Sequence, residues 1–128
     1  MGEAAAAPDD CRFCLHNGLL VDSPLFRTER FYVLGSIDPA APGAAMIIPL
    51  AHAETPFQIP AADWADFPAA LAFAHAHCGQ GQPDGYTIGW NVGAVAGQQV
   101  FHAHLHVIPR FKGSHADGRG IRAAVLRL

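Results

Sequence analysis

The chain has 128 residues, of which 51% are hydrophobic and 15% are charged, and its formal net charge is −3. This composition is too apolar for an intrinsically disordered protein, and the apolar runs are far shorter than the roughly 20 residues that cross a bilayer. The acidic balance argues against a general nucleic-acid binder, which needs a basic surface.

The first ten residues, MGEAAAAPDD, are small and acidic. We expect them to form a disordered tail in front of a single domain that spans residues 11–128. The stretch has neither the basic start nor the apolar centre of a secretory signal, which favours a cytoplasmic protein. Cys11 and Cys14 follow as a C-x-x-C motif, which in a reducing compartment favours metal or redox chemistry over a disulfide.

Residues 19–34 have the pattern of a hairpin, with Asp22, Ser23 and Pro24 as the expected turn. A loop with two prolines and a glycine, SIDPAAPG, leads into the apolar run AAMIIPL, residues 44–50. A continuous apolar run of this length is typical of a central strand.

One segment, residues 61–78, has helical periodicity, with Trp64, Phe67, Leu71 and Cys78 on one face and Gly79 as the stop. A proline inside a helix costs about 3 kcal/mol unless it lies in the first turn, so Pro68 favours a start near Phe67.

Two further strands are predicted at YTIGWNV, residues 86–92, and VFHAHLHVIPR, residues 100–110, with the turn AVAGQQ between them. These strands are expected to pair as a hairpin. Strands on both sides of one helix, without βαβ alternation, predict an α+β fold with an antiparallel sheet.

His102, His104 and His106 alternate with apolar residues in the last predicted strand. Alternate side chains of a strand point to the same face, so three imidazoles are expected side by side. Imidazole can bind metal, move protons or act as a nucleophile. No Asp or Glu lies between residues 98 and 110, which disfavours a metallohydrolase built on this strand alone. Attack on phosphorus needs a neutral imidazole and a loop rich in hydrogen-bond donors, and the chain has candidates for both.

The segment FHAHLHVIPR resembles the signature of the histidine triad (HIT) family of nucleotidyl hydrolases, in which three histidines alternate with apolar residues. CRFC resembles the C-x-x-C of zinc-containing bacterial members, AAMIIPLAH resembles the family's apolar strand, and GYTIGWNVGAVAGQQVFHAHLHVIPRFKG resembles its catalytic hairpin. The resemblance implies a HIT-like α+β fold with about five antiparallel strands and one main helix, in which the sheet continues across a homodimer.

The resemblance also implies a nucleotide hydrolase. It would cleave the α-phosphate of a purine nucleotide conjugate, such as a dinucleoside polyphosphate or a nucleoside phosphoramidate, through a covalent nucleotidyl-histidine intermediate. The residues that match the family's catalytic positions are His104 as the nucleophile, with His106, His102 and Gln98. A histidine at position 106, where the transferase branch has glutamine, favours hydrolysis over transfer. The alternative is a nucleotide-binding or interaction module with little turnover.

Substrate-binding positions follow from the same resemblance. Asn91 matches a residue that contacts the ribose or helps to order the site, Gly97 and Gln99 lie near the phosphates, and Ser36 and Ile37 lie near the ribose. Many members have Ser or Thr where Gln99 stands and an acidic residue where Ser36 stands. The expected partners are a small-molecule purine nucleotide and a second copy of the chain, with no nucleic acid, membrane or organic cofactor.

A structural zinc ion held by Cys11, Cys14, His52 and His102 is implied by the resemblance, since two distant single histidines are not found by spacing alone. A C-x-x-C without metal and a redox protein are the alternatives. His75, His77 and Cys78 form a rival cluster, in which only positions 75 and 78 share a helix face.

Two assignments stay open. Trp90 either stacks on a base or lies in a core or dimer contact. The basic C-terminal residues are either a solvated face or, at Arg119 or Arg122, a polyphosphate contact; the set is Arg110, Lys112, Arg119, Arg122 and Arg127.

Overall fold

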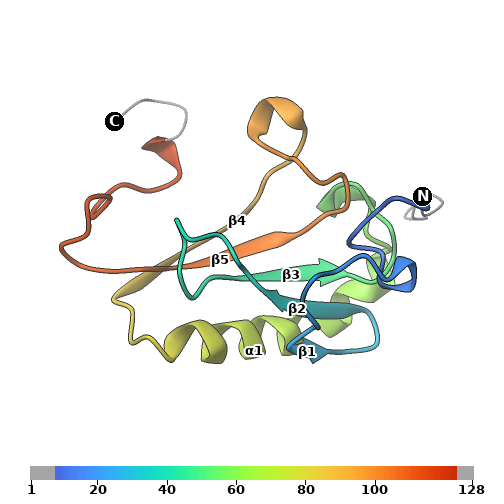
Figure 1. The fold of residues 1–128 in the computed structure, drawn as a ribbon, viewed down its shortest axis with the longest axis horizontal. Coiled ribbons are helices and arrows are strands. Elements are labelled where there is room, and N and C mark those ends of the chain that lie inside the picture. Colours follow the sequence, from blue (N-terminus) through green and yellow to red (C-terminus); the bar gives the residue numbers. More distant parts are fainter. Residues whose placement is uncertain (1–7, 124–128) are drawn as a thin grey trace.

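The computed structural model describes residues 8–123, so residues 1–7 of the predicted tail and Arg127 lie outside the described residues. Within this range, one α-helix and five strands form the fold (Figure 1). The strands are antiparallel, in the order β1-β2-β3-β5-β4. The predicted α+β architecture is confirmed, with these bounds: β1 Phe26–Arg27, β2 Phe31–Gly35, β3 Ala45–Pro49, α1 Phe67–Gly79, β4 Gly85–Trp90 and β5 Leu105–Arg110.

The two faces of the sheet are covered differently. Figure 1 shows α1 running along one face, where Val33, Ile47 and Val107 belong to the main apolar cluster. Strand pleating sends the neighbouring residues to the other face. There, Tyr32 and Ile48 pack with the N-terminal segment that carries Cys11, Phe13 and Cys14. The C-x-x-C segment therefore lies on the face that α1 leaves uncovered.

The helix begins at Phe67, as Pro68 favours. The backbone N–H groups of the first turn have no intrahelical acceptor, so a proline there breaks no hydrogen bond. The residues before it, Ala61–Asp66, form a 3₁₀-helix rather than α-helix. The fully buried positions of α1 are Ala70, Ala74 and Cys78, whose small side chains let the helix lie close to the sheet. No helix within residues 8–123 combines the length and the hydropathy of a membrane span.

The position of the first hairpin turn differs from the prediction. The chain reverses at Thr28–Arg30, between β1 and β2, and not at Asp22–Pro24. The hydroxyl of Thr28 accepts hydrogen bonds from the backbone N–H groups of Arg30 (3.3 Å) and Phe31 (3.0 Å). This side-chain to backbone bonding stabilises the turn at Thr28–Arg30.

The histidine-containing strand is shorter than predicted. β5 begins at Leu105, where it pairs with Ile47 of β3. Before that point the chain leaves the ladder, and the N–H of Ala103 donates to the carbonyl of Ala53 at 2.7 Å. His106 therefore lies in the strand, whereas His102 and His104 lie in the irregular segment that leads into it.

Candidate functional site

A cleft of about 580 Å³ opens on the face of the sheet opposite α1, a volume in the range of small-molecule sites. Within β5, Leu105 and Val107 face the main core, so the alternate residues His106 and Ile108 face the cleft. Most of the predicted site residues line this cleft: His104, His106, Asn91, Gly97, Gln99, Ser36 and Ile37.

The imidazole of His104 is half buried in the cleft and its orientation is set by the backbone. Its Nδ1 lies 2.8 Å from the carbonyl oxygen of His102, and since a carbonyl only accepts, Nδ1 carries the proton. Nε2 is then the unprotonated nitrogen. Burial lowers the pKa of His104, although the bond to His102 opposes this effect, and the nearby positive charge of Arg12 lowers the pKa further. The ring is therefore a neutral base with a free lone pair near pH 7.

His106 lies beside His104, with 4.9 Å between the ring centroids in an edge-on arrangement. Its pKa is also lowered, first by burial and then by the proximity of His104. Two neutral imidazoles that share a cleft can divide two tasks, since one can offer a lone pair while the other holds or donates a proton.

The loop between β4 and β5 brings Asn91, Gly97 and Gln99 to the cleft. Gly97 adopts the left-handed conformation (φ 96°), and a Cβ there would lie 3.8 Å from the side chain of Asn91. The positive φ, and not a lack of space, is therefore what favours glycine at this turn, since a Cβ at this distance would make only an ordinary contact.

Gln98 differs from the expectation, because it does not line the cleft. Its side chain is buried, its Oε1 accepts from the N–H of Gly93 (2.8 Å), and its Nε2 donates to the carbonyls of Glu54 (2.6 Å) and Val100 (3.2 Å). The amide is fully used in joining the 93–100 loop to the segment after β3. Gln98 can therefore affect the cleft only by holding the 93–100 loop in place.

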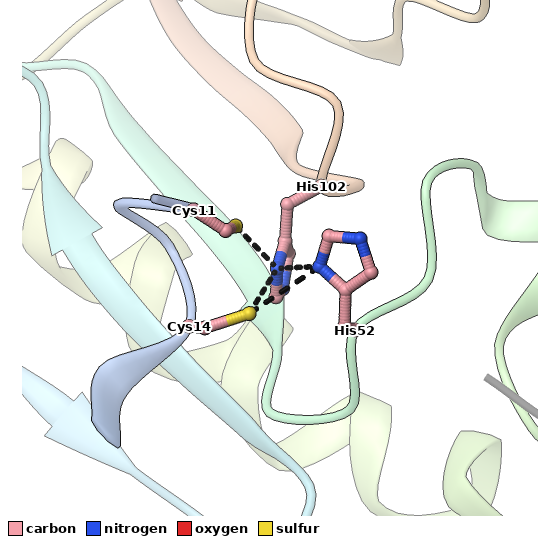
Figure 2. A group of neighbouring side chains, drawn as sticks. All are labelled: Cys11, Cys14, His52 and His102. Atoms are coloured by element: carbon pink, nitrogen blue, oxygen red, sulfur yellow. Dashed lines mark hydrogen bonds between the residues drawn. The ribbon is translucent and has the colours of Figure 1, made fainter. Parts of the chain in front are cut away.

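Cys11, Cys14, His52 and His102 come together in a buried cluster, and their ligand atoms all lie within 4.8 Å of one another. Figure 2 shows the two cysteines of the N-terminal segment and the two imidazoles pointing toward one centre. The Nδ1 atoms of His52 and His102 are 3.2 Å apart. The shortest sulfur to nitrogen distance, from Cys14 Sγ to His52 Nδ1, is 3.3 Å.

These distances fit a tetrahedral metal site. Zinc bonds of about 2.0–2.1 Å to nitrogen and about 2.3 Å to sulfur separate two nitrogen ligands by about 3.4 Å, and a nitrogen from a sulfur by about 3.6 Å. The two thiol sulfurs lie 3.4 Å (Cys11) and 3.5 Å (Cys14) from His102 Nδ1. Two sulfur and two nitrogen donors are a common structural zinc set.

Protonation in the cluster also suits a metal. His102 Nε2 donates to the carbonyl of Pro49 at 2.7 Å, which leaves the lone pair on Nδ1, toward the cysteines. Burial lowers the pKa of His102 to about 4, so its ring is neutral. Burial raises the pKa of Cys14 to about 12, and the hydrogen bond and charge of Cys11 add to this effect. A thiolate at this depth requires a neighbouring cation, which a divalent metal ion provides.

His102 thus differs from the other two histidines of the triad. Its ring belongs to the cysteine-histidine cluster and does not line the cleft, while its backbone carbonyl accepts the hydrogen bond from His104. The expectation that all three imidazoles share one face is wrong for His102. The reason is the early departure of the chain from β5, which turns this ring toward the N-terminal segment.

Arg12 and Phe13 are among the cleft residues that sequence reasoning missed. Both lie between the cysteines, and the hydroxyl of Tyr32 fixes this turn by donating to the carbonyl of Phe13 at 2.7 Å. The ring of Phe13 meets His104 edge-on, with 5.0 Å between centroids. One sequence feature could have indicated these two residues: the side chains between the cysteines of a C-x-x-C point away from the bound metal.

The remaining candidates lie elsewhere. His75 packs on Tyr86 and His77 on Phe73, so neither ring joins Cys78 in a metal site. Cys78 is buried in the main core. Trp90 packs against Trp64 and Phe67, as a core residue does, and it also lines the cleft. Arg119 lines a separate cavity with Arg110 and Lys112, and neither Arg119 nor Arg122 lines the cleft.

The chain is similar in sequence to known proteins. The sequence model of the HIT domain family matches residues 21–113. An uncharacterised HIT-like protein of Methanocaldococcus jannaschii is 31% identical over 113 residues, which cover 88% of this chain and 85% of that protein. The adenosine 5'-monophosphoramidase of Saccharomyces cerevisiae is 32% identical over 112 residues, covering 86% and 68%. An adenylylsulfatase of Arabidopsis thaliana is 30% identical, over 84% of this chain and 56% of that longer protein.

The fold is similar to a solved structure as well. A HIT family protein from Bacillus anthracis superposes with a TM-score of 0.73 at 29% identity, covering 84% of this chain and 77% of that chain. The superposed part includes the five-stranded sheet and the main helix, so the fold has a known counterpart.

Proposed function

The chain belongs to the HIT domain family, and on this premise we propose that it hydrolyses a purine nucleotide conjugate at the α-phosphate, with His104 as the nucleophile. The observation that carries the proposal is the unprotonated Nε2 of His104, fixed in the cleft by the 2.8 Å bond from Nδ1 to the carbonyl of His102. Two similar proteins are named as an adenosine monophosphoramidase and an adenylylsulfatase, which supports the same class of reaction.

In the first step, the lone pair of His104 Nε2 forms a bond to the α-phosphorus. The bond from phosphorus to the leaving group breaks, and its electron pair stays with the leaving atom, which takes a proton from water. The N–H of neutral His106 is proposed to donate a hydrogen bond to a phosphate oxygen. The product is a nucleotidyl imidazolium. The proton stays on Nδ1 and is donated to the carbonyl oxygen of His102, which stabilises the positive ring in the way that a carboxylate orients and stabilises a catalytic histidine.

In the second step, a water oxygen bonds to phosphorus and the bond to Nε2 breaks, which returns the electron pair to His104. The water proton passes to His106 or to solvent. The sum of the two steps converts conjugate and water into a nucleoside monophosphate and the protonated leaving group. Asn91 and Gln99 are proposed to donate hydrogen bonds to the phosphate oxygens, which gain charge in each transition state.

The other predicted residues have supporting places in this proposal. Ser36 and Ile37 line the cleft in the loop before β3, where they would contact the ribose. Gln98 holds the 93–100 loop through its amide, and so we assign it a positioning role rather than contact with substrate. His102 acts through its carbonyl.

We also propose that Cys11, Cys14, His52 and His102 bind a zinc ion. All four ligands come from the chain, so the site is closed and its role is structural. When bound, the ion supplies a fixed link between the N-terminal segment and the segment before β5. Thiolate ligands persist in a reducing compartment, which supports a cytoplasmic location.

A homodimer is also part of the proposal. Strand β4 lies at the edge of the sheet, and Ile88 on this strand is 45% exposed. Exposed edge strands with apolar residues are commonly covered by another segment or chain. Here β4 of a second copy would pair with β4 and continue the antiparallel sheet.

The test is mass spectrometry of protein quenched in acid-free conditions during turnover of adenosine and guanosine phosphoramidates. We expect the mass of one nucleotidyl group on the wild-type chain, on a peptide that contains His104. The variant His104→Ala should lose the adduct and at least about a thousandfold in kcat. The control is His115→Ala, since His115 is exposed and does not line the cleft.

Two results would count against the proposal. An adduct that survives in His104→Ala would assign the nucleophile to another residue. Binding of the nucleotide without adduct or turnover in the wild-type protein would favour the alternative, a nucleotide-binding module.

A further inference from the structure

A second, apolar cavity adjoins the cleft. It has a volume of about 100 Å³ and shares Arg12, Phe13, Ile37 and Met46 with the cleft, so the two spaces are neighbours. We call this second cavity the side groove. The rest of its apolar wall comes from Leu19, Leu20, Val21 and Leu34. A flat heteroaromatic ring attached to a phosphate at His104 would find its apolar surroundings here.

Two charged side chains interrupt the apolar lining of the side groove, Arg12 and Asp22. They come from separate segments: Arg12 lies in the C-x-x-C turn, and Asp22 lies in an exposed bend of the irregular segment before β1. The salt bridge found within residues 8–123 joins Arg30 to Asp63, so Arg12 and Asp22 face the groove without being paired to each other. A cation and an anion beside one apolar groove can bind a heteroaromatic ring that has hydrogen-bond acceptors on one edge and donors on the next.

The position of the Arg12 guanidinium favours edge-on hydrogen bonding. It lies over the ring of Phe13, with its central carbon 5.0 Å from the centroid. Stacking of this kind uses the face of the planar group and leaves the N–H donors at its edge free. Phe13 itself is fixed by the hydrogen bond from Tyr32, so the cation has a defined support.

Guanine matches this pair of charges and adenine does not. Arginine donates to the O6 and N7 acceptors of guanine, and this is the commonest specific contact of that base. A carboxylate can accept from the N1–H and 2-amino donors on the neighbouring edge. Adenine shares the N7 acceptor, but it has an amino donor in place of O6 and an acceptor at N1. The guanidinium would therefore meet a donor in place of O6, and the carboxylate would meet an acceptor.

We propose that Arg12 and Asp22 select guanine over adenine as the base of the substrate, in the side groove next to His104. This inference rests on the proposed function for the location of the phosphate. The apolar walls hold any purine equally, so the preference comes from the two charged groups. A site that hydrogen-bonds a substrate discriminates strongly because a wrong substrate leaves its polar groups unpaired.

The experiment measures equilibrium binding of GMP, IMP and AMP by titration calorimetry, so that no turnover is needed. Wild-type protein should bind GMP at least about tenfold more tightly than AMP. IMP has the 6-oxo group but lacks the 2-amino group, and its affinity should lie between the other two. Asp22→Asn should reduce the affinity for GMP to about that for IMP, and Arg12→Gln should weaken GMP and IMP but not AMP.

The controls are Arg27→Gln and Glu29→Gln, which remove the same charges from exposed residues near the first hairpin turn, away from the groove. Because Arg12 lies between two metal ligands, bound zinc and circular dichroism are measured for each variant. Asp22→Asn gives an independent result if Arg12→Gln alters metal content.

Equal wild-type affinities for GMP and AMP would overturn the inference. So would an Asp22→Asn variant that weakens all three nucleotides by one factor. Selective binding of GMP without a nucleotidyl adduct would refute the hydrolase but keep the base selection. An adduct that forms equally fast from adenosine and guanosine phosphoramidates, with equal binding of GMP and AMP, would refute the base selection alone.

Discussion

The Nδ1 atom of His104 donates to the backbone carbonyl of His102 over 2.8 Å, so the residue whose ring faces the metal cluster also orients the imidazole of the cleft. The metal cluster and the cleft therefore share His102: its imidazole belongs to the cluster, and its backbone carbonyl orients His104 in the cleft. A change in the metal cluster that moves the backbone at His102 will change the direction of His104 Nε2.

The pH dependence of the reaction should follow the lowered pKa values of the two cleft histidines. Protonation of His104 removes the lone pair that attacks phosphorus, so kcat/KM falls as the pH drops through its pKa. Burial lowers the pKa values of His104 and His106 below the ordinary 6.5. We expect kcat/KM to be constant near neutral pH and its acid midpoint to lie below 6.5. A midpoint at or above 6.5, with the fold intact by circular dichroism, would contradict this prediction.

Loss of the metal should destabilise the protein through the N-terminal segment. Wild-type protein should bind one zinc per chain, and Cys14→Ser should bind little. Chelation should lower the melting temperature of the wild type, since a ligand at a thousandfold excess over its Kd stabilises by about 4 kcal/mol. Cys78→Ser is the matched control, because Cys78 is an equally buried thiol outside the cluster. A Cys14→Ser protein with full zinc occupancy would show that the cluster is not the site.

Two adjacent glutamines should have separable effects. Gln98→Ala leaves the N–H of Gly93 and the carbonyl of Glu54 without these partners. Loss of a partner costs about 1–3 kcal/mol for a fully buried group and less for part-buried groups such as these. We expect a lower free energy of unfolding together with reduced kcat. Gln99→Ala removes only a residue that lines the cleft and should change KM or kcat with little effect on unfolding. Denaturant titration and steady-state kinetics of both variants check this, and equal stabilities would refute the role of Gln98.

Tyr32→Phe tests the support of the C-x-x-C turn. The variant removes the hydroxyl that donates to the carbonyl of Phe13 and leaves a buried acceptor unsatisfied, at a cost of about 1–3 kcal/mol. We expect a lower free energy of unfolding and weaker nucleotide binding, since Phe13 contacts His104. The control is Tyr86→Phe, because the Tyr86 hydroxyl makes no hydrogen bond within residues 8–123. A Tyr32→Phe protein as stable as this control would contradict the prediction.

Local patterns predicted the elements that depend on neighbouring residues. The apolar run that became β3, the helix start at Phe67 and the β4 to β5 hairpin follow from periodicity and proline chemistry, which act over a few residues. The first hairpin turn was missed because two turn signals compete in one segment. The backbone bonds to Thr28 and Asp66 favour one of them, and Asp66 is distant in sequence.

For the site, the sequence alone determined which chemistry is available: imidazoles at alternate positions, a glycine-containing turn and a pair of cysteines. Only the tertiary structure decided how these groups divide. The ring of His102 points away from His104 and His106, and the side chain of Gln98 is buried and does not line the cleft. Arg12 lines the cleft beside His104, although the two residues are about 90 positions apart in the sequence. The physical reason is that side-chain direction near a strand end depends on long-range backbone contacts, such as Ala103 to Ala53, which no local periodicity encodes.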